Sequence, residues 1–194
     1  MREEIVKLLE RENKLSDDAL SEIKNIEIDD FSNIVKEVGN EETDYIKKSE
    51  IQKDLNTQYI GKELYVFKEV ASTNTVAKFL SMHNVANGTV VISEKQTQAK
   101  GRSGKSWESP LGGVWLSIIL KPNVDQSKFP MITLATGVAV AKTLEKIGVE
   151  EPEIKWPNDI MINGKKICGI LTEAIAKFNT VENVIIGVGI DANL

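Results

Sequence analysis

Histidine and cysteine are almost absent from this 194-residue sequence, which has one of each, His83 and Cys168. A single cysteine excludes an intrachain disulfide and fits a reducing compartment. One histidine and one distant cysteine are too few to build a zinc site. His83 is also the sole candidate base for a serine triad, and it lies in a polar setting, so that chemistry is set aside as well.

Long hydrophobic runs are also missing. No apolar stretch approaches the roughly 20 residues of a membrane-spanning helix. The N-terminal Met1-Arg2-Glu3-Glu4 is charged where a secretion signal has an apolar core. The content of 41% hydrophobic and 27% charged residues is ordinary for a globular protein. We therefore expect a cytoplasmic protein with no membrane partner, built from one moderate domain and a small appendage.

Charge divides the chain at about residue 45. Residues 1–45 hold six basic and fourteen acidic side chains, a net charge of −8, whereas residues 46–194 carry a net +3. Apolar residues at positions 5, 8 and 9 share one face of a short predicted helix, and residues 39–42 resemble a linker. We predict a small acidic helical appendage over 1–45 and a second domain over 46–194. The negative charge of the appendage opposes contact with phosphates, so DNA is not expected as a partner.

The hydrophobic pattern beyond residue 45 mixes strands and helices. A short helix is expected after Ser72 or Thr73, which would cap it, and a long helix over 129–147. Asn163-Gly164 is a strong signal for a hairpin turn. Hairpins interspersed with helices predict an α+β fold, with a mixed, largely antiparallel sheet flanked by helices. The expected strands are 64–70, 89–93, 114–120, 159–162, 166–174 and 184–190.

The stretch 94–108 combines glycine with positive charge. Lys95, Lys100, Arg102 and Lys105 lie between glutamates at its two ends, with no acid among them. Glycines at 101 and 104 let the backbone approach a ligand closely. Successive N–H groups in such a loop form a concavity that binds anions, and a guanidinium can grip a phosphate with two hydrogen bonds. The loop is therefore a candidate anion site, and a solvated surface loop is the alternative.

A phosphate-binding P-loop is one interpretation of this stretch, because residues 99–106 nearly satisfy G-x-x-x-x-G-K-[ST]. A P-loop needs a strand immediately before it and a helix that starts at its lysine. Pro110 and Gly112-Gly113 follow within a few residues and prevent a helix of useful length. The P-loop interpretation is therefore rejected.

A second interpretation rests on four motifs in a fixed order. Gln96-Thr97-x-x-Lys100-Gly101-Arg102-x-Gly104-Lys105-x-Trp107 resembles the glycine- and arginine-rich adenylate loop of biotin protein ligases. Ser72-Thr73-Asn74, the run Lys155-Trp156-Pro157-Asn158-Asp159 and the segment 164–173 resemble the same family. The resemblance covers about residue 50 to the C-terminus. The sequence resembles the archaeal and bacterial type of biotin protein ligase that lacks a clear DNA-binding domain. This resemblance implies the catalytic fold shared with class II aminoacyl-tRNA synthetases.

The resemblance also implies a reaction and a set of site residues. Such ligases activate a carboxylate with ATP, and catalysis consists largely of cancelling the repulsion between the carboxylate and the α-phosphate. By resemblance, Lys155 touches both anions, and Arg102 closes over the adenylate. Lysine at 100 and 105 replaces the family's usual arginine, which keeps the charge but loses the planar fork. The implied substrate-binding residues are Ser72, Thr73, Asn74, Gln96, Lys100, Gly101, Arg102, Lys105, Trp107, Lys155, Asn158, Lys166 and Gly169.

Two departures from the family pattern stand near the C-terminus. The usual Gly-x-Gly-Ile-Asn ends in Asp191 here, and an aspartate there would strengthen a Mg²⁺ site or, without metal, repel phosphate. The family normally continues with a further helix and often a small β-barrel, whereas three residues follow Asp191. We therefore expect either that the C-terminal part of the catalytic domain is absent or that the sequence is a fragment.

The expected function is that of an ATP-dependent biotin protein ligase. It would convert biotin to biotinyl-5′-AMP and transfer it to a lysine of a biotin carboxyl carrier protein or domain, with ATP, biotin and Mg²⁺ as ligands. One alternative is a lipoate- or octanoate-type ligase on the same scaffold. Another is a catalytically weak adenylate-binding module. A homodimer is left open.

Overall fold

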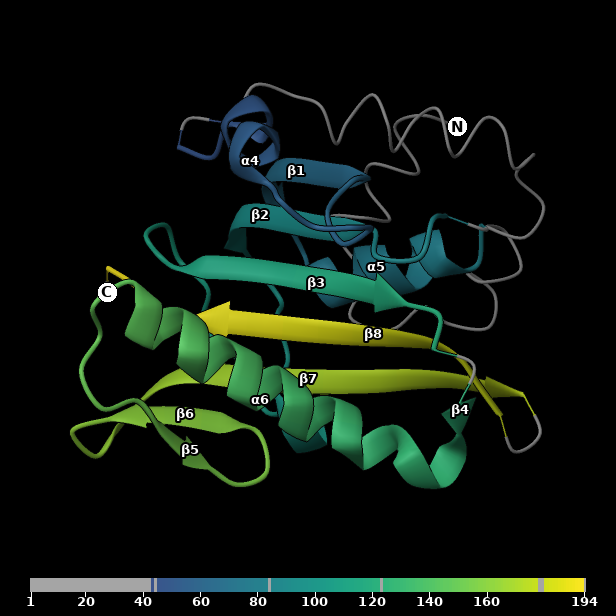
Figure 1. The fold of residues 1–194 in the computed structure, drawn as a ribbon. Coiled ribbons are helices and arrows are strands. Elements are labelled where there is room, and N and C mark those ends of the chain that lie inside the picture. Colours follow the sequence, from purple (N-terminus) through teal and green to yellow (C-terminus); the bar gives the residue numbers. More distant parts are fainter. Residues whose placement is uncertain (1–42, 44, 84, 123, 178–179, 194) are drawn as a thin grey trace.

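The computed structural model describes residues 43, 45–83, 85–122, 124–177 and 180–193 (Figure 1). The predicted appendage and its linker therefore lie almost entirely outside the described residues. Within the described part, one eight-stranded sheet carries helices on both of its faces. No helix of that part is long and apolar enough to cross a membrane.

The sheet has the strand order β1-β2-β3-β8-β7-β6-β5, and the short β4 pairs with β8 beside this path. β1 and β2 are parallel, and every other pair is antiparallel. The predicted α+β fold with a mixed, largely antiparallel sheet is therefore confirmed. The strands are β1 (Leu64–Val70), β2 (Val90–Gln96), β3 (Val114–Leu120), β4 (Val124–Asp125), β5 (Glu153–Lys155), β6 (Asp159–Ile162), β7 (Lys165–Lys177) and β8 (Thr180–Ile190).

Alternation along the strands decides which helix covers which face. Tyr65 and Phe67 of β1 pack with α5 (Thr73–Ser81), whereas Leu64 and Val66 point the other way and pack near α4 (Lys48–Asp54). Successive side chains of a strand point to opposite faces, so both faces of β1 are buried over its first four residues. The long helix α6 (Phe129–Lys146) covers β7 and lies in front of the sheet in Figure 1.

Local signals in the sequence match the observed elements closely. β1 and β3 have the predicted bounds, and α6 ends one residue before the predicted end, ahead of Gly148 at a φ of 91°. Asn163 and Gly164 join β6 to β7 with φ values of 51° and 75°, as a two-residue hairpin turn requires. β2 and β8 are longer than predicted, because pairing with their neighbours extends them.

A buried carboxylate ties the start of the described chain to the sheet. Glu94 is 3% exposed, and its Oε1 accepts hydrogen bonds from the backbone N–H groups of Tyr45 (2.6 Å) and Ile46 (2.9 Å). Ile46 also packs against the hydrophobic cluster between α4 and the sheet. The backbone next to the predicted boundary at residue 45 is thus part of the main domain.

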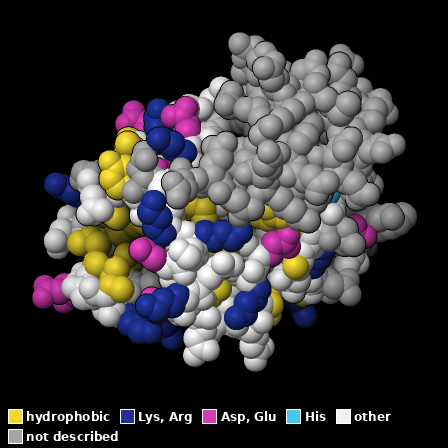
Figure 2. Space-filling model, turned by 90° about the horizontal axis from the view of Figure 1, so that it is seen from above, with side chains coloured by type: hydrophobic (Ala, Val, Ile, Leu, Met, Phe, Trp, Pro, Cys, Tyr) yellow, Lys and Arg dark blue, Asp and Glu magenta, His cyan; other side chains and the backbone are white. Residues whose placement is uncertain are grey.

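The described surface carries mixed charge. Figure 2 shows basic and acidic side chains interspersed on the face seen from above. This mixture agrees with the small net charge of +3 for residues 46–194.

Candidate active site

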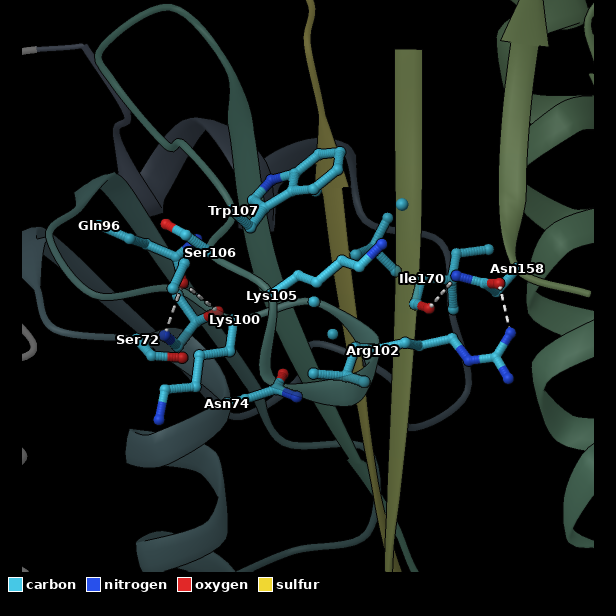
Figure 3. A pocket seen from close by; sticks show the side chains of 18 of the residues that line it. Ser72, Asn74, Gln96, Lys100, Arg102, Lys105, Ser106, Trp107, Asn158 and Ile170 are labelled. Carbon is cyan, nitrogen blue, oxygen red and sulfur yellow. Dashed lines mark hydrogen bonds between the residues drawn. The ribbon is translucent and has the colours of Figure 1, made fainter. Parts of the chain in front are cut away.

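A cavity of about 470 Å³ opens where the start of α5, the loop 99–107 and the strands β7 and β8 meet (Figure 3). It collects residues from all four predicted motifs. Ser72 and Gln96 lie on one side of it, and Arg102 and Asn158 lie on the other. The predicted site residues that line it are Ser72, Thr73, Asn74, Gln96, Lys100, Gly101, Arg102, Lys105, Trp107, Asn158, Lys166 and Gly169.

Glycines on the strands leave room for the side chains that line this cavity. A Cβ at Gly187 would lie 2.3 Å from Asn74 Oδ1, and one at Gly189 would lie 2.6 Å from Trp107 Nε1. At Gly169 the added Cβ would lie 3.1 Å from the Trp107 ring. Trp107 therefore lies against β7 and β8, where any larger residue would displace it.

The side of the cavity near α5 is lined mainly by neutral polar side chains, and Figure 3 also draws Lys100 on this side. Gln96 Oε1 accepts from the backbone N–H of Thr73 (2.8 Å) and from its hydroxyl (3.1 Å), and Gln96 Nε2 donates to Ser109 (2.9 Å). Ser117 Oγ lies 2.8 Å from Thr73 Oγ1 and 2.6 Å from Asn74 Oδ1. Ser72 stands at the N-cap of α5, one of the two predicted positions, but its side chain makes no capping hydrogen bond. These groups can instead recognise a neutral polar ligand.

The basic loop folds back on itself over the cavity. Gly101 N–H donates to the Lys105 carbonyl at 2.7 Å, and a short 3-10 turn, η1 (Arg102–Gly104), lies between them. Ser103 and Gly104 take φ values of 58° and 72° there. No α-helix begins at Lys105, which agrees with the rejection of a P-loop. Arg102 Nη1 donates to Asn158 Oδ1 at 2.9 Å, so the loop reaches across to the residue that precedes β6.

Lys166 brings a positive charge to the cavity from the start of β7. Its Nζ lies 2.7 Å from Asp159 Oδ1 and 4.8 Å from the centre of the Trp107 ring. An ion pair and a cation–π contact together hold the ammonium at one place, although the side chain is 36% exposed. Asp159 also lines the cavity and was missed as a site residue, although it ends the motif Lys155-Trp156-Pro157-Asn158-Asp159.

Lys155, the predicted catalytic lysine, is placed differently. It ends the edge strand β5, its side chain is exposed, and it is not among the residues that line the cavity. Its backbone pairs with Asp159, so the motif does reach the cavity, but through its last two residues. The structure therefore does not bring Lys155 together with the other predicted site residues.

A model described as the biotin/lipoate A/B protein ligase family matches residues 66–191. This range contains every residue that lines the cavity. The chain belongs to this family.

Curated relatives of this chain are also ligases by name. The chain is 43% identical over 149 residues to the bifunctional ligase/repressor BirA of Bacillus subtilis, an alignment that covers 76% of the chain and 46% of the relative. It is 31% identical over 155 residues to the biotin–[acetyl-CoA-carboxylase] ligase of Mycobacterium tuberculosis, covering 72% and 55% of the two chains. The chain thus spans about half the length of these relatives.

Solved structures of this family share the fold. The biotin protein ligase of Aquifex aeolicus in complex with biotin and ATP superposes with a TM-score of 0.54 at 35% identity, over 66% of this chain and 52% of that one. The enzyme of Leishmania major in complex with biotinyl-5-AMP gives a TM-score of 0.58 at 25% identity, over 66% and 57%. The mixed sheet of this chain is the fold of these biotin protein ligases.

Asp191, the residue that departs from the family motif, lies beyond the end of β8 and outside the cavity lining. Burial raises the pKa of its carboxyl, and the nearby Lys166 opposes the rise. Among the residues that the structure describes, no three His, Cys, Asp or Glu side chains converge to hold a metal ion. The metal role of Asp191 stays a prediction.

Proposed function

We propose that this member of the biotin/lipoate ligase family activates biotin with ATP and transfers it to a lysine of a carrier domain. In the first step, a biotin carboxylate oxygen attacks the α-phosphorus of ATP, and pyrophosphate leaves. In the second step, the carrier lysine amine attacks the acyl carbon, and AMP leaves. The net products are an amide, AMP and pyrophosphate.

One observation carries the proposal: a single cavity brings a cluster of neutral hydrogen-bonding side chains together with cationic ones. Thr73, Asn74 and Gln96 supply hydrogen bonds without net charge, as the ureido group of biotin requires. Lys166 and Arg102 supply positive charge at the other side, where the carboxylate must meet the α-phosphate. The complexes of the relatives with biotin and ATP and with biotinyl-5-AMP support biotin and ATP as the ligands.

We assign the catalytic charge to Lys166 in place of Lys155. Two anions repel each other as they approach, and a cation between them lowers the barrier because it is most strongly attracted when their charges are closest. Lys166 lines the cavity beside Trp107 and is anchored by Asp159, whereas Lys155 does not line it. Arg102 closes the loop over the adenylate and, through its hydrogen bond to Asn158, holds the loop against the sheet.

A lipoate- or octanoate-type ligase is the alternative within the same family. The alkyl chain of octanoate carries no group that can bond to Thr73, Asn74 or Gln96, whereas the ureido group of biotin can add hydrogen bonds to those that these residues already make within the protein. Such a mismatch is costly, because a site built for hydrogen bonds strongly rejects analogues that lack them. The polar side of the cavity thus favours biotin. The predicted carrier domain is supported by the name of the Mycobacterium tuberculosis relative, an acetyl-CoA-carboxylase ligase.

The test is pyrophosphate release by the 194-residue chain with ATP, Mg²⁺ and biotin, lipoate or octanoate in parallel. We expect release with biotin and little with the other acids, followed by labelling of an added biotin carboxyl carrier domain. Preference for octanoate or lipoate would move the activity to the other branch of the family. Adenylate binding without pyrophosphate release from any acid would leave only a weak adenylate-binding module.

A further inference from the structure

The side-chain amide of Asn74 is held from two sides. Asn74 lies in the first turn of α5 and is 8% exposed. Its Nδ2 donates to Glu173 Oε2 of β7 at 2.8 Å, and its Oδ1 lies 2.6 Å from Ser117 Oγ of β3. Gly187 of β8 lies directly beneath, since a Cβ there would come within 3.0 Å of both amide heteroatoms. The amide is thus seated on the sheet with a different partner at each end.

Glu173 determines the orientation of the Asn74 amide, that is, which way its oxygen and its nitrogen point. The oxygen and nitrogen of an asparagine amide have nearly the same shape, so hydrogen-bond partners determine how the group faces. An ionised carboxylate only accepts hydrogen bonds, and therefore the NH₂ group of Asn74 must face it. Lys78, one turn further along α5, holds the other carboxylate oxygen at 2.5 Å and keeps Glu173 in place.

The direction of the remaining hydrogen bonds follows from counting protons. Asn74 Oδ1 can only accept, so the single hydroxyl proton of Ser117 is donated to it. Ser117 then has no proton for Thr73, whose own hydroxyl proton must be used toward Ser117 or toward Gln96 Oε1. In either case the Thr73 hydroxyl can only accept from a ligand.

We infer that Glu173 is a positioning residue, which fixes the Asn74 amide and through it the hydrogen-bond character of the polar side of the cavity. With the amide held this way, the second Nδ2 proton of Asn74 serves a ligand carbonyl, and Thr73 Oγ1 serves a ligand N–H. The site therefore selects a neutral head group that has both, as a urea does. This inference rests on the proposed function, because it concerns how the same cavity recognises biotin.

Glu173→Gln tests the inference with little change in shape. A glutamine at this place can offer either an oxygen or an NH₂ group, so it no longer dictates how Asn74 faces. We expect the Kd for biotin alone, followed by calorimetry or by tryptophan fluorescence, to rise about tenfold, in the range of one hydrogen bond to a charged group. The KM for ATP should stay within about twofold of the parent value. Ser117→Ala, which removes the partner on the other side of the amide, should weaken biotin binding in the same direction.

Glu69→Gln is the matched control. Glu69 also forms an ion pair with a lysine, Lys95 at 2.6 Å, but lies on β1 and does not line the cavity. This variant should bind biotin as the parent does, which separates the loss of an ion pair from the loss of positioning.

The decisive measurement repeats Glu173→Gln in an Asn74→Ala background. If Glu173 acts through Asn74, the substitution should then change the Kd for biotin by less than about twofold, since the two residues act as one unit. An equal loss in both backgrounds, or a Glu173→Gln protein that binds biotin as tightly as the parent, would overturn the inference. A parent protein that binds no biotin would refute the proposed function itself, and the positioning role would fall with it.

Discussion

Replacing Lys166 with alanine is the sharpest test of the proposed chemistry. The ammonium of Lys166 lines the cavity, 2.7 Å from Asp159 and over the Trp107 ring. Two unit charges about 4 Å apart interact by about 4 kcal/mol near a protein surface and by about 1 kcal/mol in bulk water. Lys166 is 36% exposed, so its effect on the developing charge should fall between these limits, at about 2–3 kcal/mol. This corresponds to a loss of about 10²-fold in the rate of adenylate formation.

The assay is pyrophosphate release from ATP and biotin under single-turnover conditions, so that chemistry is measured apart from product release. Two lysines serve for comparison. Lys165→Ala changes the neighbouring residue of the same hairpin, and it should leave the rate within about twofold because Lys165 does not line the cavity. Lys155→Ala should do the same if the catalytic charge belongs to Lys166.

Stability must be followed in the same proteins. Lys166→Ala removes the partner of Asp159, whose side chain is 21% exposed, and for such a partly exposed pair we expect a loss of about 1 kcal/mol or less in the free energy of unfolding. A folded Lys166→Ala protein with a near-normal rate would refute the assignment. A 10²-fold loss in Lys155→Ala with none in Lys166→Ala would return the role to Lys155.

Three further predictions concern other parts of the molecule. Arg102→Gly should spare adenylate formation but release biotinyl-AMP, because the loop loses its hydrogen bond to Asn158. Mass spectrometry should then find biotin on lysines of added bystander proteins. Labelling confined to the carrier domain would contradict this prediction. Burial raises the pKa of Cys168 to about 12, so iodoacetamide at pH 8 should modify it only after unfolding. Because this folded pKa lies above the ordinary value of 9.0, the thiol ionises first in the unfolded chain, and the fold should lose stability above about pH 9. Removing residues 1–42 should leave turnover within a few-fold. Removing residues 1–46 should lower the free energy of unfolding by about 1–3 kcal/mol in urea titrations, because the buried Glu94 carboxylate loses the backbone N–H donors of Tyr45 and Ile46. Equal stability of the two truncated proteins would refute this role of Glu94.

Elements specified by neighbouring residues could be predicted from the sequence. The alternation of β1, the Asn163-Gly164 turn and the end of α6 before Gly148 depend on side-chain period and on backbone freedom at one or two positions. The four motifs likewise indicated the family, because each motif is a contiguous run of residues and their order along the chain can be read directly from the sequence. The parallel pairing of β1 with β2 and the insertion of β8 between β3 and β7 were not predictable, since they depend on contacts between distant segments.

The sequence by itself therefore determined the kinds of chemistry present: a flexible cationic loop, a polar run before a helix and a lysine-bearing hairpin. Only the tertiary structure decided which of these groups meet. The motif that contains Lys155 indicated a catalytic lysine, yet that residue lies on an exposed edge strand, and Lys166, eleven positions later, lines the cavity. Asn74 and Glu173 are separated by 99 positions and meet across the sheet. Such pairs carry no local signal, because their contact depends on how β7, β8 and α5 pack together.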